Sequence, residues 1–133
     1  MLPYTAEIFQ LSTEIPHLGH LPPPALTVTA VSPVCGSRIT LSVRLAAGRV
    51  ERFAWEVEAC ALGQASAALI GKRVVGWGAT EINETAQVLE TLLKSADPLP
   101  DAYDWLAPLI PARAVPQRHG SVLLPLRVFQ KAF

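Results

Sequence analysis

Two cysteines and one histidine are the residues of this chain whose types and settings could do chemistry. Cys35 lies in the segment PVCGS, Cys60 in EACALGQ and His119 in RHG, each beside the end of an expected helix or strand. Thiolate and imidazole groups bind zinc, iron and iron-sulfur units, and three such ligands leave one coordination position open. The three residues therefore predict a metal or cluster site if folding brings them together.

The local sequence around these residues favours an open site with a reactive thiol. A helix is expected to begin near Cys60, and a helix N-terminus lowers the pKa of a cysteine, so the thiolate that binds metals is favoured there. Gly36 and Gly120 carry no side-chain bulk beside Cys35 and His119. We expect a metal, or the chain of a sulfur donor, to approach the backbone at these glycines.

The fourth coordination position of such a site stays open to several ligands. Water, a cysteine of a partner protein, Ser37 or Glu58 could each occupy it. An open and exchangeable site suits transfer of a cargo better than its storage.

Each of these residues also has an ordinary structural interpretation. Free cysteine is among the most buried residue types, so Cys35 and Cys60 taken singly could be small core side chains. His119 could be a surface residue that starts a helix. A thiol enzyme, in which His119 activates a cysteine as nucleophile, is a third alternative. The chain shows no Gly-rich or acid-partner signature for such chemistry, and we expect no enzymatic activity.

The composition indicates one soluble, folded domain over residues 1–133. Half of the residues are hydrophobic and 17% are charged, which excludes disorder as the main state. Lys plus Arg balances Asp plus Glu at 11 each, so no global charge recruits nucleic acid or a membrane surface. Residues 1–19 contain two acidic side chains and no Lys or Arg, unlike a secretory signal. We expect a cytoplasmic protein with reduced thiols.

Residue periodicity in the first half of the chain predicts a helix followed by three strands. Apolar residues recur at helical spacing over residues 5–15, with Thr5 as the N-cap. Three prolines at 22–24 impose an extended connector, after which residues 26–31 alternate as an edge strand. Segments 39–45 and 50–57 also alternate, and the Gly-containing turn at 46–49 joins them as a hairpin.

The second half of the chain predicts helices. Small residues from Cys60 onward favour a close-packed helix that stops at Gly71. Thr80 is expected to cap a helix through residue 93. Residues 98–101 form an expected loop, 105–109 a short helical turn, and 121–133 a terminal helix with Pro125 in its first turn. This order predicts an α+β fold, a small three-stranded antiparallel sheet with helices packed on one face.

The motifs together resemble the iron-sulfur cluster assembly scaffold family, of the IscU/SufU-like or NifU N-terminal type. The resemblance rests on PVCG before a hairpin, EACALGQAS after it and RHGSVL before a terminal helix, and it covers nearly the whole chain. It implies a SufE/NifU-like fold in which Cys35, Cys60 and His119 meet at one end and hold a transient iron-sulfur cluster, or a zinc or iron ion. It also implies a cysteine desulfurase or other sulfur donor and acceptor apo-proteins as partners, with no nucleic acid or membrane.

Two positions depart from the family pattern. Ser37 stands where the family has an Asp, two residues after the first cysteine, and Gly120 stands where it has a third cysteine beside the histidine. Both departures remove anionic ligands. Two functions therefore stay open: a scaffold or carrier that passes a cluster to acceptors, and a degenerate relative that binds zinc or the sulfur-transfer machinery as a regulator or adaptor.

Overall fold

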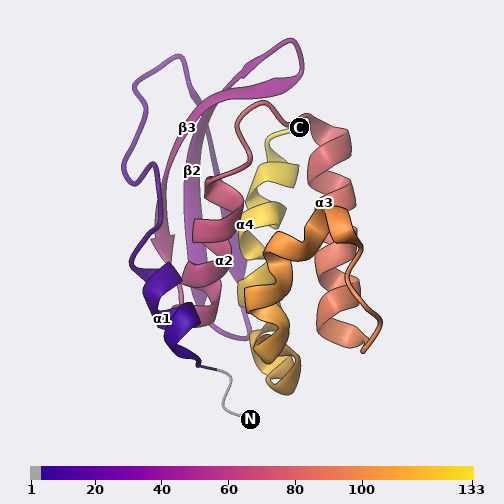
Figure 1. Ribbon diagram of the computed structural model, residues 1–133. Helices are drawn as coiled ribbons and strands as arrows, with labels where there is room; N and C mark the ends of the chain where they lie inside the picture. Colours follow the sequence, from indigo (N-terminus) through magenta and orange to yellow (C-terminus); the bar gives the residue numbers. More distant parts are fainter. Residues whose placement is uncertain (1–3) are drawn as a thin grey trace.

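The protein is an antiparallel sheet covered on one face by helices (Figure 1). The computed structural model describes residues 4–133. The strands are β1 (Leu26–Ser32), β2 (Ser37–Ala46) and β3 (Arg49–Glu58), with β2 in the centre. The helices are α1 (Ala6–Ser12), α2 (Ala61–Gly71), α3 (Ala79–Lys94) and α4 (His119–Lys131), and the 3₁₀ segments η1 (Asp101–Ala114) and η2 (Pro116–Arg118) join α3 to α4. The predicted α+β class and three-stranded sheet are confirmed.

Strand register brings the two cysteine segments to the same end of the sheet. Ser32 of β1 pairs with Ser37 of β2, which leaves a four-residue hairpin loop that contains Cys35. Strand β3 ends at Glu58, opposite the second residue of β2, and Cys60 follows two residues later. At the other end of the sheet, Ala47 and Gly48 both have positive φ, 53° and 73°. Two positive φ values in a two-residue loop are typical of a type I′ turn, and the Gly-containing hairpin turn predicted at 46–49 is present.

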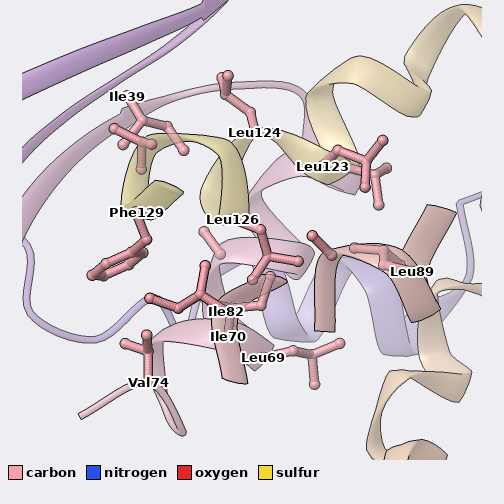
Figure 2. Packing of buried hydrophobic residues seen from close by; sticks show 14 of the residues in the cluster. Ile39, Leu69, Ile70, Val74, Ile82, Leu89, Leu123, Leu124, Leu126 and Phe129 are labelled. Atoms are coloured by element: carbon pink, nitrogen blue, oxygen red, sulfur yellow. The ribbon is translucent and has the colours of Figure 1, made fainter. Parts of the chain in front are cut away.

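The hydrophobic core lies between the sheet and helices α2, α3 and α4. Phe129 of α4 is fully buried, and its ring centroid lies 5.2 Å from that of Phe53 and 5.6 Å from that of Trp55, both on β3. Figure 2 shows Leu126 and Phe129 of α4 with Ile70 of α2 and Ile82 of α3 among the buried residues of this core. Burial of one such large side chain contributes about 1.5–3 kcal/mol, so this core fixes how α4 sits on the sheet.

Helices α2 and α4 begin at the same end of the molecule, the lower end in Figure 1. The small residues of α2 are buried almost throughout, including Gly63, Ala65 and Ser66. Small side chains let two helix backbones approach closely, and the Ser66 hydroxyl donates to the Val122 carbonyl of α4 at 2.6 Å. The close-packed helix predicted after Cys60 is therefore present, and its N-terminus lies against that of α4.

One of the two predicted helix caps is present and the other is not. Thr5 caps α1 through its hydroxyl, which accepts from the Ile8 N–H at 3.1 Å, but the helix ends at Ser12 and not at residue 15. The prediction that Thr80 caps α3 is wrong. The N-cap is Gly78, whose N–H donates to the Glu81 carboxylate at 2.7 Å, so a side chain within the helix satisfies the terminus.

The terminal helix starts earlier than predicted. Helix α4 begins at His119, not at residue 121, so Pro125 lies in the helix interior and its expected place in the first turn is wrong. Proline removes one helical hydrogen bond, and the Pro125 side chain is buried. The predicted turn at 105–109 is part of the longer segment η1. No helix within residues 4–133 is long and apolar enough to cross a membrane.

Candidate functional site

Cys35 lies at the tip of the β1–β2 hairpin and contacts the segment that leads into α4. Its Sγ donates to the Gln117 carbonyl at 3.1 Å and lies 3.6 Å from the Ser32 hydroxyl. The side chain is half-buried, so the sulfur is neither sealed in the core nor free of neighbours. Gly36 next to it has a φ of 71°, which glycine adopts without strain, and this turns the chain back into β2.

Cys60 is the N-cap of α2 and contacts the first turn of α4. Its Sγ lies 3.6 Å from the Ser121 hydroxyl, and the side chain is half-buried. Burial by itself raises the pKa of this thiol. The N–H groups of Gly63 and Leu62 oppose this effect, as do the Ser121 hydroxyl and the Arg118 guanidinium, because all four favour the thiolate. The net result is a Cys60 pKa below its ordinary value.

A positive charge lies beside the thiols. The pKa of Arg118 is raised, first by its hydrogen bond to Cys60 and further by the acidic groups of Tyr4, Cys60 and Cys35. In the absence of a metal, this guanidinium is the counter-charge for a thiolate at Cys60. A cation bound by the thiolates would take over that role.

His119 is the first residue of α4, and one of its ring nitrogens is already engaged. Its Nε2 lies 2.9 Å from the Ala112 carbonyl of η1. A carbonyl can only accept, so this contact requires a proton on Nε2 and leaves Nδ1 as the nitrogen with a free lone pair. Histidine ligands in metal sites commonly donate their second N–H to a backbone carbonyl in this way.

The three predicted residues gather at one end of the domain without forming a coordination site. Cys35 contacts Gln117 and Cys60 contacts Ser121, and these two positions lie within one turn of His119. Within the part of the chain that the structure describes, however, no three His, Cys, Asp or Glu side chains are arranged to hold a metal ion. By type, two thiols and an imidazole fit a thiophilic metal. Because they are not arranged around one point, their side chains would have to move to coordinate it together.

Three buried serines line the space between the cysteines, and sequence reasoning identified only one of them. Ser32, Ser37 and Ser121 are 6%, 3% and 0% exposed. The Ser37 hydroxyl, predicted as a possible fourth ligand, lies 2.9 Å from that of Ser121. The other predicted alternative, Glu58, is exposed at the end of β3. The position of the serines in the sequence could have identified the other two. Ser32 and Ser37 lie on either side of the loop that contains Cys35, and Ser121 lies in a largely apolar terminal helix.

Two glycines at the site are held by close packing. A Cβ on Gly63 would lie 2.8 Å from the Ala59 Cβ and closer still to the Ser121 hydroxyl. A Cβ on Gly120 would meet the Ser32 hydroxyl well inside van der Waals contact. The space expected to be open beside Gly120 is therefore filled by Ser32, and that expectation is wrong.

Comparison with known proteins agrees with this architecture. The family profile described as NifU-like N terminal domain matches residues 3–103. The crystal structure of a nitrogen-fixing NifU-like protein (N-terminal) from Brucella abortus is similar to this chain, with 31% sequence identity and a TM-score of 0.88, over 97% of this chain and 90% of that one. No curated protein sequence matches significantly.

Two further crystal structures share the fold at lower identity. One, described as a hypothetical protein, has 24% identity and a TM-score of 0.81 over 96% of this chain and 93% of that one. The other is a candidate iron-sulfur cluster assembly scaffold protein for the SUF system from the thermophile Fervidobacterium islandicum AW-1. It has 22% identity and a TM-score of 0.77, over 96% of this chain and 94% of that one. The profile match and the Brucella structure establish that this chain belongs to the NifU-like N-terminal domain family.

Proposed function

We propose that this protein is a carrier for iron or an iron-sulfur unit, which it holds through Cys35, Cys60 and His119 and passes to acceptor apo-proteins. The observation that carries the proposal is the convergence of two half-buried thiols on the start of α4 and on the η2 segment directly before it. Cys35 reaches Gln117, and Cys60 reaches Ser121. These contacts come from segments far apart in the sequence, and membership of a family of assembly scaffolds supports the same role.

The chemistry of the site suits a cargo that is bound and released. Cys60 has a lowered pKa, so the thiolate that binds a metal forms at lower pH than it does in an ordinary cysteine. His119 keeps Nδ1 free while Nε2 donates to the Ala112 carbonyl. With only two thiolates and one imidazole, one coordination position of the cargo is left to a donor or acceptor protein. We propose a cysteine desulfurase or another sulfur donor as the source of sulfide.

The geometry favours a carrier over a thiol enzyme. An activating base must lie within hydrogen-bond reach of the nucleophile. The His119 ring nitrogen Nε2 instead contacts the Ala112 carbonyl, while the Cys35 thiol contacts Gln117 and Ser32. No imidazole is thus paired with Cys35 in the described structure.

Anaerobic reconstitution with iron and sulfide tests the carrier function. The wild-type protein should develop a sulfur-to-iron charge-transfer absorption band, and Cys35→Ala or Cys60→Ala should abolish it. His119→Ala should weaken or abolish the band, whereas the control His20→Ala should not, because His20 pairs with Glu56 on the exposed side of the sheet. Transfer to an apo-ferredoxin-type acceptor is then followed by recovery of acceptor absorbance. A full band in Cys35→Ala and Cys60→Ala would contradict the proposal.

A second function, regulation of the sulfur-transfer machinery with zinc at the site, is favoured by the absence of a third thiolate. Ser37 and Gly120 replace two anionic residues of the family pattern. In this case the purified protein retains stoichiometric zinc and gives no chromophore with iron and sulfide. It should then change the rate of sulfide release by a cysteine desulfurase, and Cys60→Ala should lose that effect.

A further inference from the structure

One serine occupies the place from which a side chain at position 120 would enter the site. A Cβ built on Gly120 meets only Ser32 within 4 Å, apart from its chain neighbours and its own helix. The hydroxyl oxygen of Ser32 is far inside contact distance, whereas the Ser32 Cβ lies at an ordinary 3.5 Å. The hydroxyl alone is therefore the obstacle, and an alanine at position 32 would leave room.

The same hydroxyl contacts the first cysteine of the site. The Ser32 Oγ lies 3.6 Å from the Cys35 Sγ, so a side chain at position 120 would point toward Cys35 through the space that Ser32 fills. Ser32 is 6% exposed and is the last β1 residue paired with β2. Its backbone is held by the sheet, so the residue as a whole cannot move away, and rotation of its hydroxyl to another χ1 rotamer would break the contact with the Cys35 sulfur.

We propose that Ser32 is a specificity-determining residue that limits this site to two thiolates of its own chain. Its hydroxyl excludes any side-chain ligand from position 120 and offers the Cys35 sulfur a neutral hydrogen-bond partner instead. The inference rests on the proposed carrier function, because it concerns the ligand number of that site. In this proposal the number of thiolate ligands is limited by Ser32 and Gly120 together, and not only by the lack of a side chain at Gly120.

The consequence for the cargo is weaker and more exchangeable binding. Two thiolates neutralise a divalent cation, whereas a third would add a negative charge and a strong soft ligand. A groove of about 610 Å³ between β1 and α4 reaches Ser32 and Gly120. A ligand from another molecule can approach through this groove as far as Ser32, on a side of the site where the chain itself supplies no ligand.

Cobalt substitution measures the number of thiolates directly. Reduced, chelator-stripped protein is titrated anaerobically with Co²⁺, and the thiolate-to-cobalt charge-transfer intensity and the dissociation constant are recorded for the wild type, Gly120→Cys, Ser32→Ala and the double variant. Gly120→Cys alone should leave the intensity of the wild type unchanged and the affinity within about twofold. Ser32→Ala/Gly120→Cys should raise the intensity by half and tighten binding by on the order of tenfold or more.

Two further measurements complete the test. One uses a cysteine placed far from the site, and the other compares thermal midpoints of variants at positions 32 and 120 without metal. Ala79→Cys adds a third thiol at the start of α3, near the opposite hairpin end, and should change neither quantity. Gly120→Ala should lower the thermal midpoint in the wild type but not in the Ser32→Ala background, and this readout needs no metal and no new cysteine.

The outcomes separate the two proposals. If Gly120→Cys alone gains the third thiolate, or if the thermal cycle shows no coupling between positions 32 and 120, the Ser32 inference is overturned and the carrier function stands. If the wild type gives no thiolate-to-cobalt band while the thermal coupling is present, the proposed metal-bearing function fails, and Ser32 is reduced to a packing residue.

Discussion

The hydroxyl groups of Ser37 and Ser121 lie 2.9 Å apart, although the residues are separated by 84 positions in the sequence. Ser37 begins β2, and Ser121 lies in the first turn of α4. The Ser121 hydroxyl also contacts the Cys60 thiol at the start of α2. This buried polar contact therefore joins three elements at the end of the domain where the cysteines lie. It links the stability of the fold to the position of one proposed ligand.

Removal of Ser121 should destabilise the protein more than removal of Ser37. Ser121→Ala leaves the buried Ser37 hydroxyl without its partner, and we expect a loss of about 1–3 kcal/mol in the free energy of unfolding. Ser37→Ala leaves Ser121 in contact with Cys60, so we expect about 1 kcal/mol or less. Urea denaturation measures both. Ser12→Ala, which removes an exposed hydroxyl bonded to the Phe9 carbonyl, should stay within about 0.5 kcal/mol. Equal losses for the two buried serines would contradict this account.

Gly63→Ala should destabilise the protein, although alanine usually stabilises a helix by about 1 kcal/mol relative to glycine. The new Cβ would press on the Ser121 hydroxyl and lie 2.8 Å from the Ala59 Cβ, so we expect a net loss of about 1–3 kcal/mol from overpacking. In the Ser121→Ala background one of these clashes disappears, and the loss caused by Gly63→Ala should shrink. A net gain in thermal midpoint would show that α2 and α4 can separate without penalty.

Cys60 should react as a thiolate at a lower pH than free cysteine. Alkylation rates in metal-free Cys35→Ser protein, measured against pH, should give an apparent pKa below the free value of about 8.5. Ser121→Ala and Arg118→Gln should each move it upward, because each removes a group that favours the thiolate.

The lowered pKa of Cys60 also predicts how the free energy of unfolding depends on pH. The folded thiol loses its proton before the unfolded one, so the advantage of the wild type over Cys60→Ala should grow as pH rises from below the folded pKa to the ordinary pKa, and then level off. A reactivity profile centred at or above the free value would contradict the proposed environment of Cys60.

The sequence allowed the arrangement of the cysteine segments to be predicted, but not the contacts between them. Alternating strands around a Gly-containing turn put Cys35 and Cys60 at one end of the sheet, because hairpin register follows from local pattern and turn geometry. The contact between Ser32 and Gly120 depends on how α4 docks on β1, which local periodicity does not encode. Thr80 failed as a cap for a local reason, since the Glu81 carboxylate already accepts the Gly78 N–H.

His119 should bind its metal through Nδ1 and keep the proton on Nε2. The ring donates from Nε2 to the Ala112 carbonyl at 2.9 Å, and retention of that bond would hold the imidazole in one tautomer and one orientation during loading and release. Zinc titration of ¹⁵N-histidine-labelled protein, followed by NMR, should shift the Nδ1 resonance of His119 while Nε2 stays protonated, and should leave the exposed His20 unchanged. Loss of the Nε2 proton on zinc binding would mean that the imidazole leaves Ala112 and turns over to coordinate, in which case η1 contributes nothing to positioning the ligand.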